Sequence, residues 1–125
     1  MRPANSFESR AVWIFLSAFF GLLTACHSYH IEATVKNSTG GPISLLEVDY
    51  PSASFGADAL GASAEVHHRI QTQGTGLLKV LYTDGSGKQV QINGPTLHEK
   101  QEGGIEINLL PNSKAEFHPA LHPAL

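Results

Sequence analysis

The stretch LLKVLYTDGSGKQVQING, residues 77–94, decides the fold class. Apolar and polar residues alternate on both sides of the turn DGSG at 84–87, and this period of two predicts a pair of half-buried strands. Asp-Gly tolerates the positive φ that tight hairpins need. The stretch therefore predicts a β-hairpin of residues 77–83 and 88–92. Its inward-facing side chains would be Leu78, Val80, Tyr82, Val90 and Ile92.

The same alternation recurs on both sides of this hairpin. It predicts further strands at HIEATVK (30–36), ISLLEVDY (43–50), AEVHHRIQT (64–72) and GIEINLL (104–110). A short strand is predicted around 53–55, with Phe55 and Leu60 in the core, and 94–104 is typical of a polar loop anchored by Leu97. No segment has a helical apolar stripe. Six or seven short antiparallel strands at this spacing predict an all-β sandwich.

The alternation ends at residue 110. Residues 111–125 contain the repeat HPAL-HPAL at 118–125, in which Pro119 and Pro123 disfavour a continuous helix. We therefore predict that the sandwich domain spans 30–110 and that 111–125 is an extended or disordered tail.

A generic likeness refines the fold prediction. Leu60-Gly61-Ala62-Ser63 before an alternating strand resembles the corner that precedes a strand in immunoglobulin-like and fibronectin type III-like modules. The Cys…Trp…Cys pattern of true immunoglobulin domains is absent from residues 30–110. The resemblance implies a small immunoglobulin-like β-sandwich and no particular activity.

The first 25 residues differ from this pattern. MRPANSFESR carries Arg2 and Arg10 against Glu8, and AVWIFLSAFFGLLTA at 11–25 has no charged side chain. A basic start followed by an apolar run of about 7–15 residues is typical of a secretory signal peptide. The run is short for a membrane-spanning helix, which needs about 20 residues. Residues 1–25 are therefore predicted to be a cleaved signal peptide.

Leu23-Thr24-Ala25-Cys26 closes this run with the one cysteine of the chain. An aliphatic residue and two small residues before a cysteine resemble the lipobox of bacterial lipoproteins. The resemblance implies that signal peptidase II recognises Leu23, Thr24 and Ala25 and cuts before Cys26, which then carries acyl chains such as palmitate. Residues 26–29 would be a lipidated tether. The alternative is a buried or free cysteine that happens to follow a signal peptide, although an unpaired thiol would be a liability in an exported protein.

The residue after the cysteine bears on location. His27, and not aspartate, follows Cys26. The sorting rule of Gram-negative lipoproteins then implies an anchor in the periplasmic face of the outer membrane. The expected location is therefore the bacterial cell envelope.

The charge balance argues against one class of partner. Without residues 1–25 the chain keeps 6 Lys and Arg and 10 Asp and Glu, a net charge of −4 before histidine, with no basic stripe. Nucleic-acid binding is therefore disfavoured. The expected partners are the membrane, through the lipid, and an envelope protein.

Histidine is the unusual component, and all seven histidines follow residue 25. The weak candidates for a metal site are His67, His68 and His98. His67 and His68 are neighbours in a strand and point to opposite faces, whereas the ligands of zinc converge at about 2.0–2.1 Å. No metal or other cofactor is therefore expected. A periplasmic histidine-based metal-binding or metal-delivery protein is the alternative function.

No catalytic motif is present, since GxSxG, HExxH and a P-loop are all missing. Glu47 and Asp49 share one strand face, for which a solvated surface is the simpler interpretation. The aliphatic strand 77–83, with Ile43 and Leu45, would leave a partner surface exposed unless a loop or the tail covers it. We therefore expect a non-enzymatic binding or assembly module.

Overall fold

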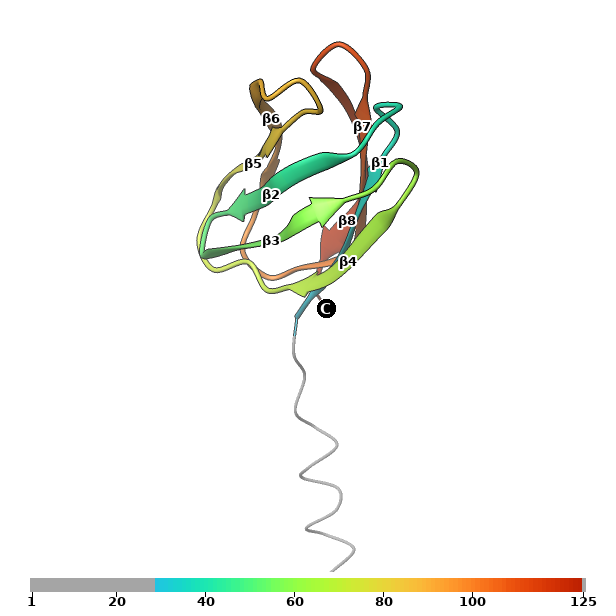
Figure 1. The fold of residues 1–125 in the computed structure, drawn as a ribbon. Helices are drawn as coiled ribbons and strands as arrows, with labels where there is room; N and C mark the ends of the chain where they lie inside the picture. Colours follow the sequence, from blue (N-terminus) through green and yellow to red (C-terminus); the bar gives the residue numbers. More distant parts are fainter. Residues whose placement is uncertain (1–28, 125) are drawn as a thin grey trace, which may run out of the picture.

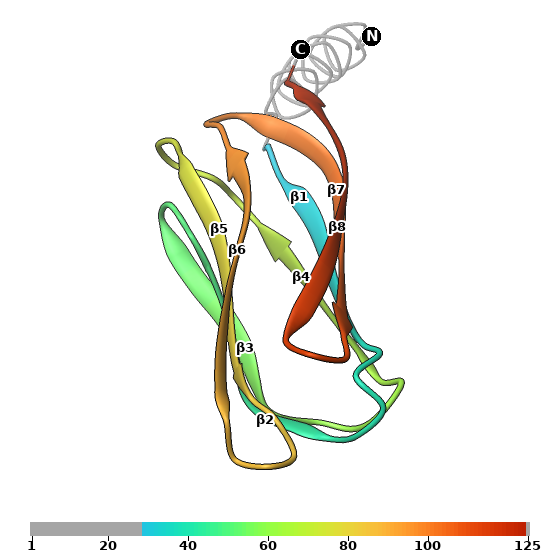
Figure 2. The same cartoon turned by 90° about the horizontal axis from the view of Figure 1, so that it is seen from above.

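The computed structural model describes residues 29–124, which form two β-sheets packed face to face (Figures 1 and 2). The described strands are β1 (Ile31–Asn37), β2 (Ile43–Tyr50), β3 (Ala53–Leu60), β4 (Glu65–Ile70), β5 (Gly76–Thr83), β6 (Gln89–Leu97), β7 (Gln101–Leu110) and β8 (Lys114–Pro123). One sheet has the order β4-β1-β7-β8 and the other β3-β2-β5-β6. The predicted all-β sandwich is confirmed. The predicted signal peptide, lipobox and Cys26 lie outside the described residues.

The hairpin that decides the fold class is confirmed as β5 and β6. Val80 pairs with Ile92 and Thr83 with Gln89. The Asp84 carboxylate closes the turn by accepting hydrogen bonds from the Ser86 and Lys88 N–H groups, both at 3.0 Å. The positive φ of 88° falls at Gly87 and not at the Asp-Gly pair. The hairpin was thus predictable, whereas the residue that takes the left-handed conformation was not.

The prediction of a tail at 111–125 outside the sandwich is wrong. Lys114–Pro123 is the strand β8, which pairs antiparallel with β7 from Leu110↔Lys114 to Gln101↔Pro123. Its prolines are tolerated because β8 is an edge strand, where a missing N–H breaks no inner ladder. The apolar side chains Ala115, Phe117 and Leu121 pack against the core. The domain therefore continues to Pro123.

Two finer features differ from an antiparallel immunoglobulin-like arrangement. Successive strands reverse direction, so the odd-numbered strands β1 and β7 run the same way, and they pair in parallel with Val35 beside Ile107. The orders β4-β1-β7-β8 and β3-β2-β5-β6 also differ from the ABED and CFG sheets of immunoglobulin constant domains. The likeness therefore holds for the two-sheet architecture and not for the strand order.

The core lies between the two sheets and follows the predicted alternation. Phe55, Leu60 and Leu97 are buried as expected, although β6 and β7 extend into the predicted loop 94–104 and reduce it to a short turn. The remaining buried apolar side chains are Ile31, Ala33, Val35, Ile43, Leu46, Val48, Ile70, Leu78, Val80, Tyr82, Val90, Ile105, Ile107 and Leu109. Within residues 29–124 no helix is long and apolar enough to cross a membrane.

Asn37 joins the two sheets at the end of β1. Its side chain is fully buried, and its Nδ2 donates hydrogen bonds to the carbonyl oxygens of Gly41 at 2.8 Å and of Leu60 and Gly61 at 3.1 Å. Its Oδ1 accepts hydrogen bonds from the Thr39 N–H at 3.1 Å and the Thr39 hydroxyl at 2.7 Å. This cluster, the Asn37 joint, ties the β1–β2 turn to the end of β3.

The two ends of the sandwich carry different features. The start of β1 and the C-terminus lie at the same end, and the turns that follow β1, β3, β5 and β7 lie at the opposite end (Figure 1). The start of β1 therefore lies at the end of the sandwich away from the Asn37 joint.

Candidate functional site

A β-bulge in β2 interrupts the outer face of the β3-β2-β5-β6 sheet. Ser44 pairs with Thr83 and Glu47 with Leu81, so that Leu45 and Leu46 together oppose Tyr82 alone. The extra residue changes the phase of the strand. Ile43 and Leu46 are both buried as a result, and the prediction that Ile43 shares an exposed face with Leu45 is wrong.

Leu45 occupies an unfavourable conformation at this bulge. Its φ is 53°, in the left-handed region that costs an L-residue roughly 1–2 kcal/mol. Its side chain is 65% exposed, so burial does not offset that cost. Bulges and strained residues of this kind are concentrated at functional sites, where they redirect a side chain.

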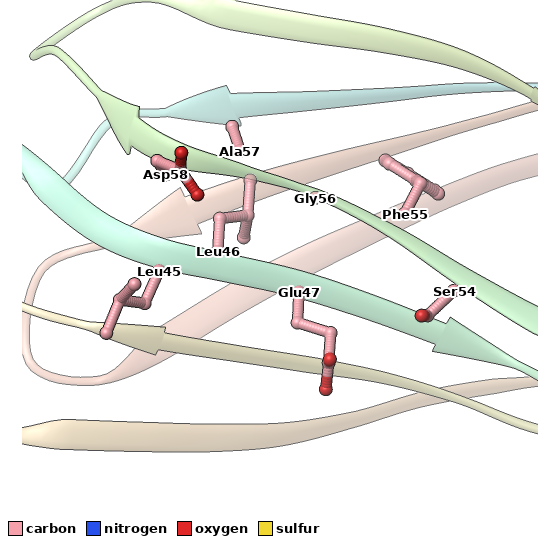
Figure 3. A pocket seen from close by; sticks show the side chains of 8 residues that line it. All are labelled: Leu45, Leu46, Glu47, Ser54, Phe55, Gly56, Ala57 and Asp58. Atoms are coloured by element: carbon pink, nitrogen blue, oxygen red, sulfur yellow. The ribbon is translucent and has the colours of Figure 1, made fainter.

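A hollow of about 520 Å³ lies beside Leu45 between β2 and β3. Figure 3 shows Leu45 and Glu47 pointing to one side of β2 and Leu46 to the other. Gly56 of β3 pairs with Glu47 and forms the floor of the hollow. A Cβ at position 56 would collide with the carbonyl oxygen of Leu46, so that only glycine fits and the hollow stays open.

A second hollow, of about 420 Å³, lies on the other side of Leu45 and Glu47. Its lining includes Leu81 and Tyr82 of β5 and Gln91 of β6. The Tyr82 side chain itself points into the core, where burial, and then the negative charge of Asp84, raise the pKa of its phenol. Leu45 and Glu47 thus form a ridge between two hollows, and we call this surface the β2 ridge.

The surface around the β2 ridge is acidic. Glu47 and Asp49 of β2 and Asp58 of β3 lie there, and none of the three forms an ion pair with a residue in the described range. Lys79 is the register partner of Asp49 on β5. A partner of this surface would therefore meet an exposed leucine flanked by carboxylates, of which only Asp49 has a lysine as its register partner on β5.

The structure does not bring the three candidate metal ligands together. His67 lies on the outer face of β4, where its Nδ1 is 3.0 Å from Thr34 Oγ1 and its Nε2 is 3.3 Å from Glu65 Oε2. His68 points to the other face and its ring stacks on Phe55 at 4.7 Å. His98 lies in the turn between β6 and β7.

The metal-ligating side chains of residues 29–124 do not converge elsewhere either. No group of three His, Cys, Asp or Glu side chains in this range could hold a metal ion. The histidines that contact carboxylates do so in separate pairs, such as His118 Nε2 with Glu116 Oε2 at 3.2 Å. The geometry of the described residues therefore offers no metal centre.

Sequence reasoning placed Leu45 on an exposed face, but it did not find the bulge or the hollow. The run Ile43-Ser44-Leu45-Leu46 contains the signal, since two adjacent leucines break the alternation of β2. The role of Gly56 carries no such signal, because its close neighbour is a backbone atom of another strand.

Comparisons with known proteins establish only the fold. No protein-family model matches the chain, and no curated protein matches its sequence. The NMR structure of a protein from Eubacterium rectale is similar, with a TM-score of 0.54 and 14% sequence identity, over 74% of this chain and 90% of that chain. At this identity the likeness supports the β-sandwich and implies no function.

Proposed function

We propose that the protein is a lipid-anchored, non-enzymatic binding or assembly module of the bacterial envelope, and that the β2 ridge contacts its partner. The observation that carries this proposal is Leu45. Its backbone is strained and its side chain is 65% exposed, so burial offsets little of the cost of this conformation. A contact with another molecule would explain why leucine occupies this position.

The anchor rests on the sequence at Leu23–Cys26. Lipid on Cys26 would hold the start of β1 near the membrane, because only a few residues separate Cys26 from Ile31. Leu45 follows the β1–β2 turn at the other end of the sandwich. Leu45 would then lie toward the end of the sandwich far from the anchoring bilayer, which favours a protein partner over a lipid partner. Outer-membrane attachment follows only in a Gram-negative cell.

The histidine-based metal function receives less support. His67, His68 and His98 point into different surroundings, and each of the first two already has a contact within the sandwich.

Site-specific photo-crosslinking in the envelope tests the binding role. A photoreactive amino acid replaces Leu45 in one variant and Lys114 of β8 in the control variant. We expect a discrete crosslinked partner from position 45 and none from position 114. Equal patterns at the two positions, or no product from position 45, would contradict the proposal.

Mass spectrometry of the membrane-extracted protein tests the anchor. We expect an N-terminal Cys26 that carries diacylglycerol, and a Cys26→Ser variant that is released from the membrane fraction. A full-length chain without lipid, or cleavage at another bond, would refute the anchor.

A further inference from the structure

The four edge strands of the described sheets are protected to different degrees. An edge strand presents unpaired N–H and C=O groups, and proteins block it with proline, lysine, charges, bulges or short length. β8 has Pro119 and Pro123, β6 has Pro95, and β4 has six residues that include Glu65 and Arg69. Phe117 of β8 also packs against Gly94 of β6. β8, β6 and β4 therefore resist the addition of a further strand.

β3 has fewer of these protections, although its Phe55 ring stacks on His68 of β4 at 4.7 Å, which is a contact between side chains. Its sequence ASFGADAL has no proline, lysine or arginine over 8 residues, and Asp58 is its one charged side chain. β2 pairs with one edge of β3, and within residues 29–124 no strand pairs with the other edge. Small side chains let another backbone approach closely. β3 is thus an open edge that can form hydrogen bonds with an added strand.

The surface beside this edge favours basic side chains. Glu47 and Asp58 line the same hollow above Gly56, and neither has an ion-pair partner within the described range. An added strand would run about 10 Å from β2, twice the usual strand spacing. A long basic side chain opposite Gly56 meets no side chain on β3 and can extend across the hollow toward Glu47.

We propose that the open edge of β3 receives an extended segment of a partner protein, which pairs with it main chain to main chain and directs lysine or arginine side chains toward Glu47 and Asp58. This inference rests on the proposed function, since it specifies the partner of the β2 ridge. A second copy of the chain fits this edge less well. Its own Glu47 and Asp58 would bring like charges to a surface that is already acidic.

Titration with a synthetic peptide tests the inference. The probe is acetyl-(Lys-Val)₃-Lys-amide, and the protein is the ¹⁵N-labelled full chain in detergent micelles. We expect amide shift changes centred on residues 53–60. Shift changes centred on β4, β6 or β8 would overturn the assignment to β3.

Two matched peptides separate main-chain pairing from charge attraction. N-methylation of alternate amides on one edge of the peptide leaves every side chain in place and removes the donors that face β3. Replacement of lysine by glutamate keeps the donors and reverses the charge. We expect each change to weaken binding at least tenfold. Equal binding of the N-methylated peptide would overturn strand addition, and equal binding of the glutamate peptide would overturn the charge preference.

Two protein variants locate the site. Asp58→Lys should weaken peptide binding at least tenfold, whereas Glu116→Lys makes the same charge change on the outer face of β8 and should leave binding unchanged. No difference between the variants would overturn the role of Asp58. If the peptide fails to bind and concentration-dependent dimers protect the amides of β3, the occupant is a second copy and the inference is wrong.

The outcomes also separate this inference from the proposed function. If position 45 forms crosslinks but the peptide does not bind, strand addition at β3 is refuted and the proposed binding role of the ridge stands. If the peptide binds but position 45 forms no crosslinks, the proposed binding role of the ridge in the envelope is refuted. The inference that the β3 edge accepts an added strand then stands.

Discussion

The Asn37 joint and the β2 ridge lie close in sequence, but one contains a buried polar residue and the other an exposed apolar residue. Asn37 is a polar side chain that is fully buried, and its donor and acceptor atoms all have partners. Leu45 is an apolar side chain that is 65% exposed on a left-handed backbone. Polar side chains are usually exposed and apolar ones buried, so both residues are exceptions. The hydrogen bonds of Asn37 stabilise the fold, whereas the exposed side chain of Leu45 has no comparable set of contacts.

The difference shows how the two kinds of exception can be distinguished. A buried polar group with complete hydrogen bonding stabilises a structure, because its removal leaves carbonyl groups without partners. A strained and exposed apolar residue gains little stabilisation from burial, and it therefore indicates an interaction with another molecule. Stability measurements should move in opposite directions at the two positions.

The largest effect is expected at the Asn37 joint. Asn37→Ala should lower the free energy of unfolding by about 3 kcal/mol, because buried carbonyl oxygens lose their donors. Urea unfolding followed by circular dichroism measures this loss. Ser38→Ala at the neighbouring, half-buried position should change stability by less than about 0.5 kcal/mol. Similar values for the two variants would remove the distinction between the joint and an ordinary turn.

Gly56 should be the next most sensitive position. Gly56→Ala places a methyl group against the carbonyl oxygen of Leu46, and the strands must move apart at a cost of about 2 kcal/mol. Gly61→Ala is the control, because a Cβ there meets nothing within 4 Å and its φ is not positive. A Gly56→Ala protein as stable as the control would show that the floor of the hollow is not fixed by packing.

Substitution of Leu45 should have the opposite sign. Leu45→Gly relieves the left-handed strain and removes an exposed side chain, so the free energy of unfolding should rise by up to about 1 kcal/mol. The same urea experiment measures the change. A lower free energy of unfolding for the variant would mean that Leu45 supports the fold, and the contrast with Asn37 would then fail.

Alternation in the sequence was sufficient to predict most of the core. Leu78, Val80 and Tyr82 are buried as their spacing requires, and Phe55, Leu60 and Leu97 fill the positions expected of them. These predictions succeed because a strand with one buried face must repeat every second residue. The prediction failed at Ile43 because the bulge at Leu45 inserts an extra residue into β2, so that Ile43 and Leu46 both face the core.

Features that depend on distant chain segments could not be predicted in the same way. β8 alternates weakly and contains two prolines, and it is a strand because β7 offers it a full-length partner. The Asn37 side chain donates hydrogen bonds to carbonyl groups 23 and 24 residues away in the sequence, and no local sequence pattern predicts such contacts. The β2 ridge depends on both effects, since its bulge is local and the glycine beneath it belongs to another strand.

The smallest effect is expected at the hairpin turn, where exposed hydrogen bonds contrast with the buried ones of Asn37. The Ser86 hydroxyl at 2.7 Å, and then the Lys88 N–H, hold the pKa of the Asp84 carboxyl below its ordinary value. A pKa that is lower in the folded state adds stability above the unfolded pKa, near pH 4, and this contribution disappears as the pH falls through the folded pKa. Asp84→Asn should therefore lose stability slightly at pH 7 and flatten the acid limb of the stability curve, as measured by thermal unfolding between pH 2 and 7. Parallel curves for the wild type and the variant would mean that the solvent-exposed carboxylate does not stabilise the turn.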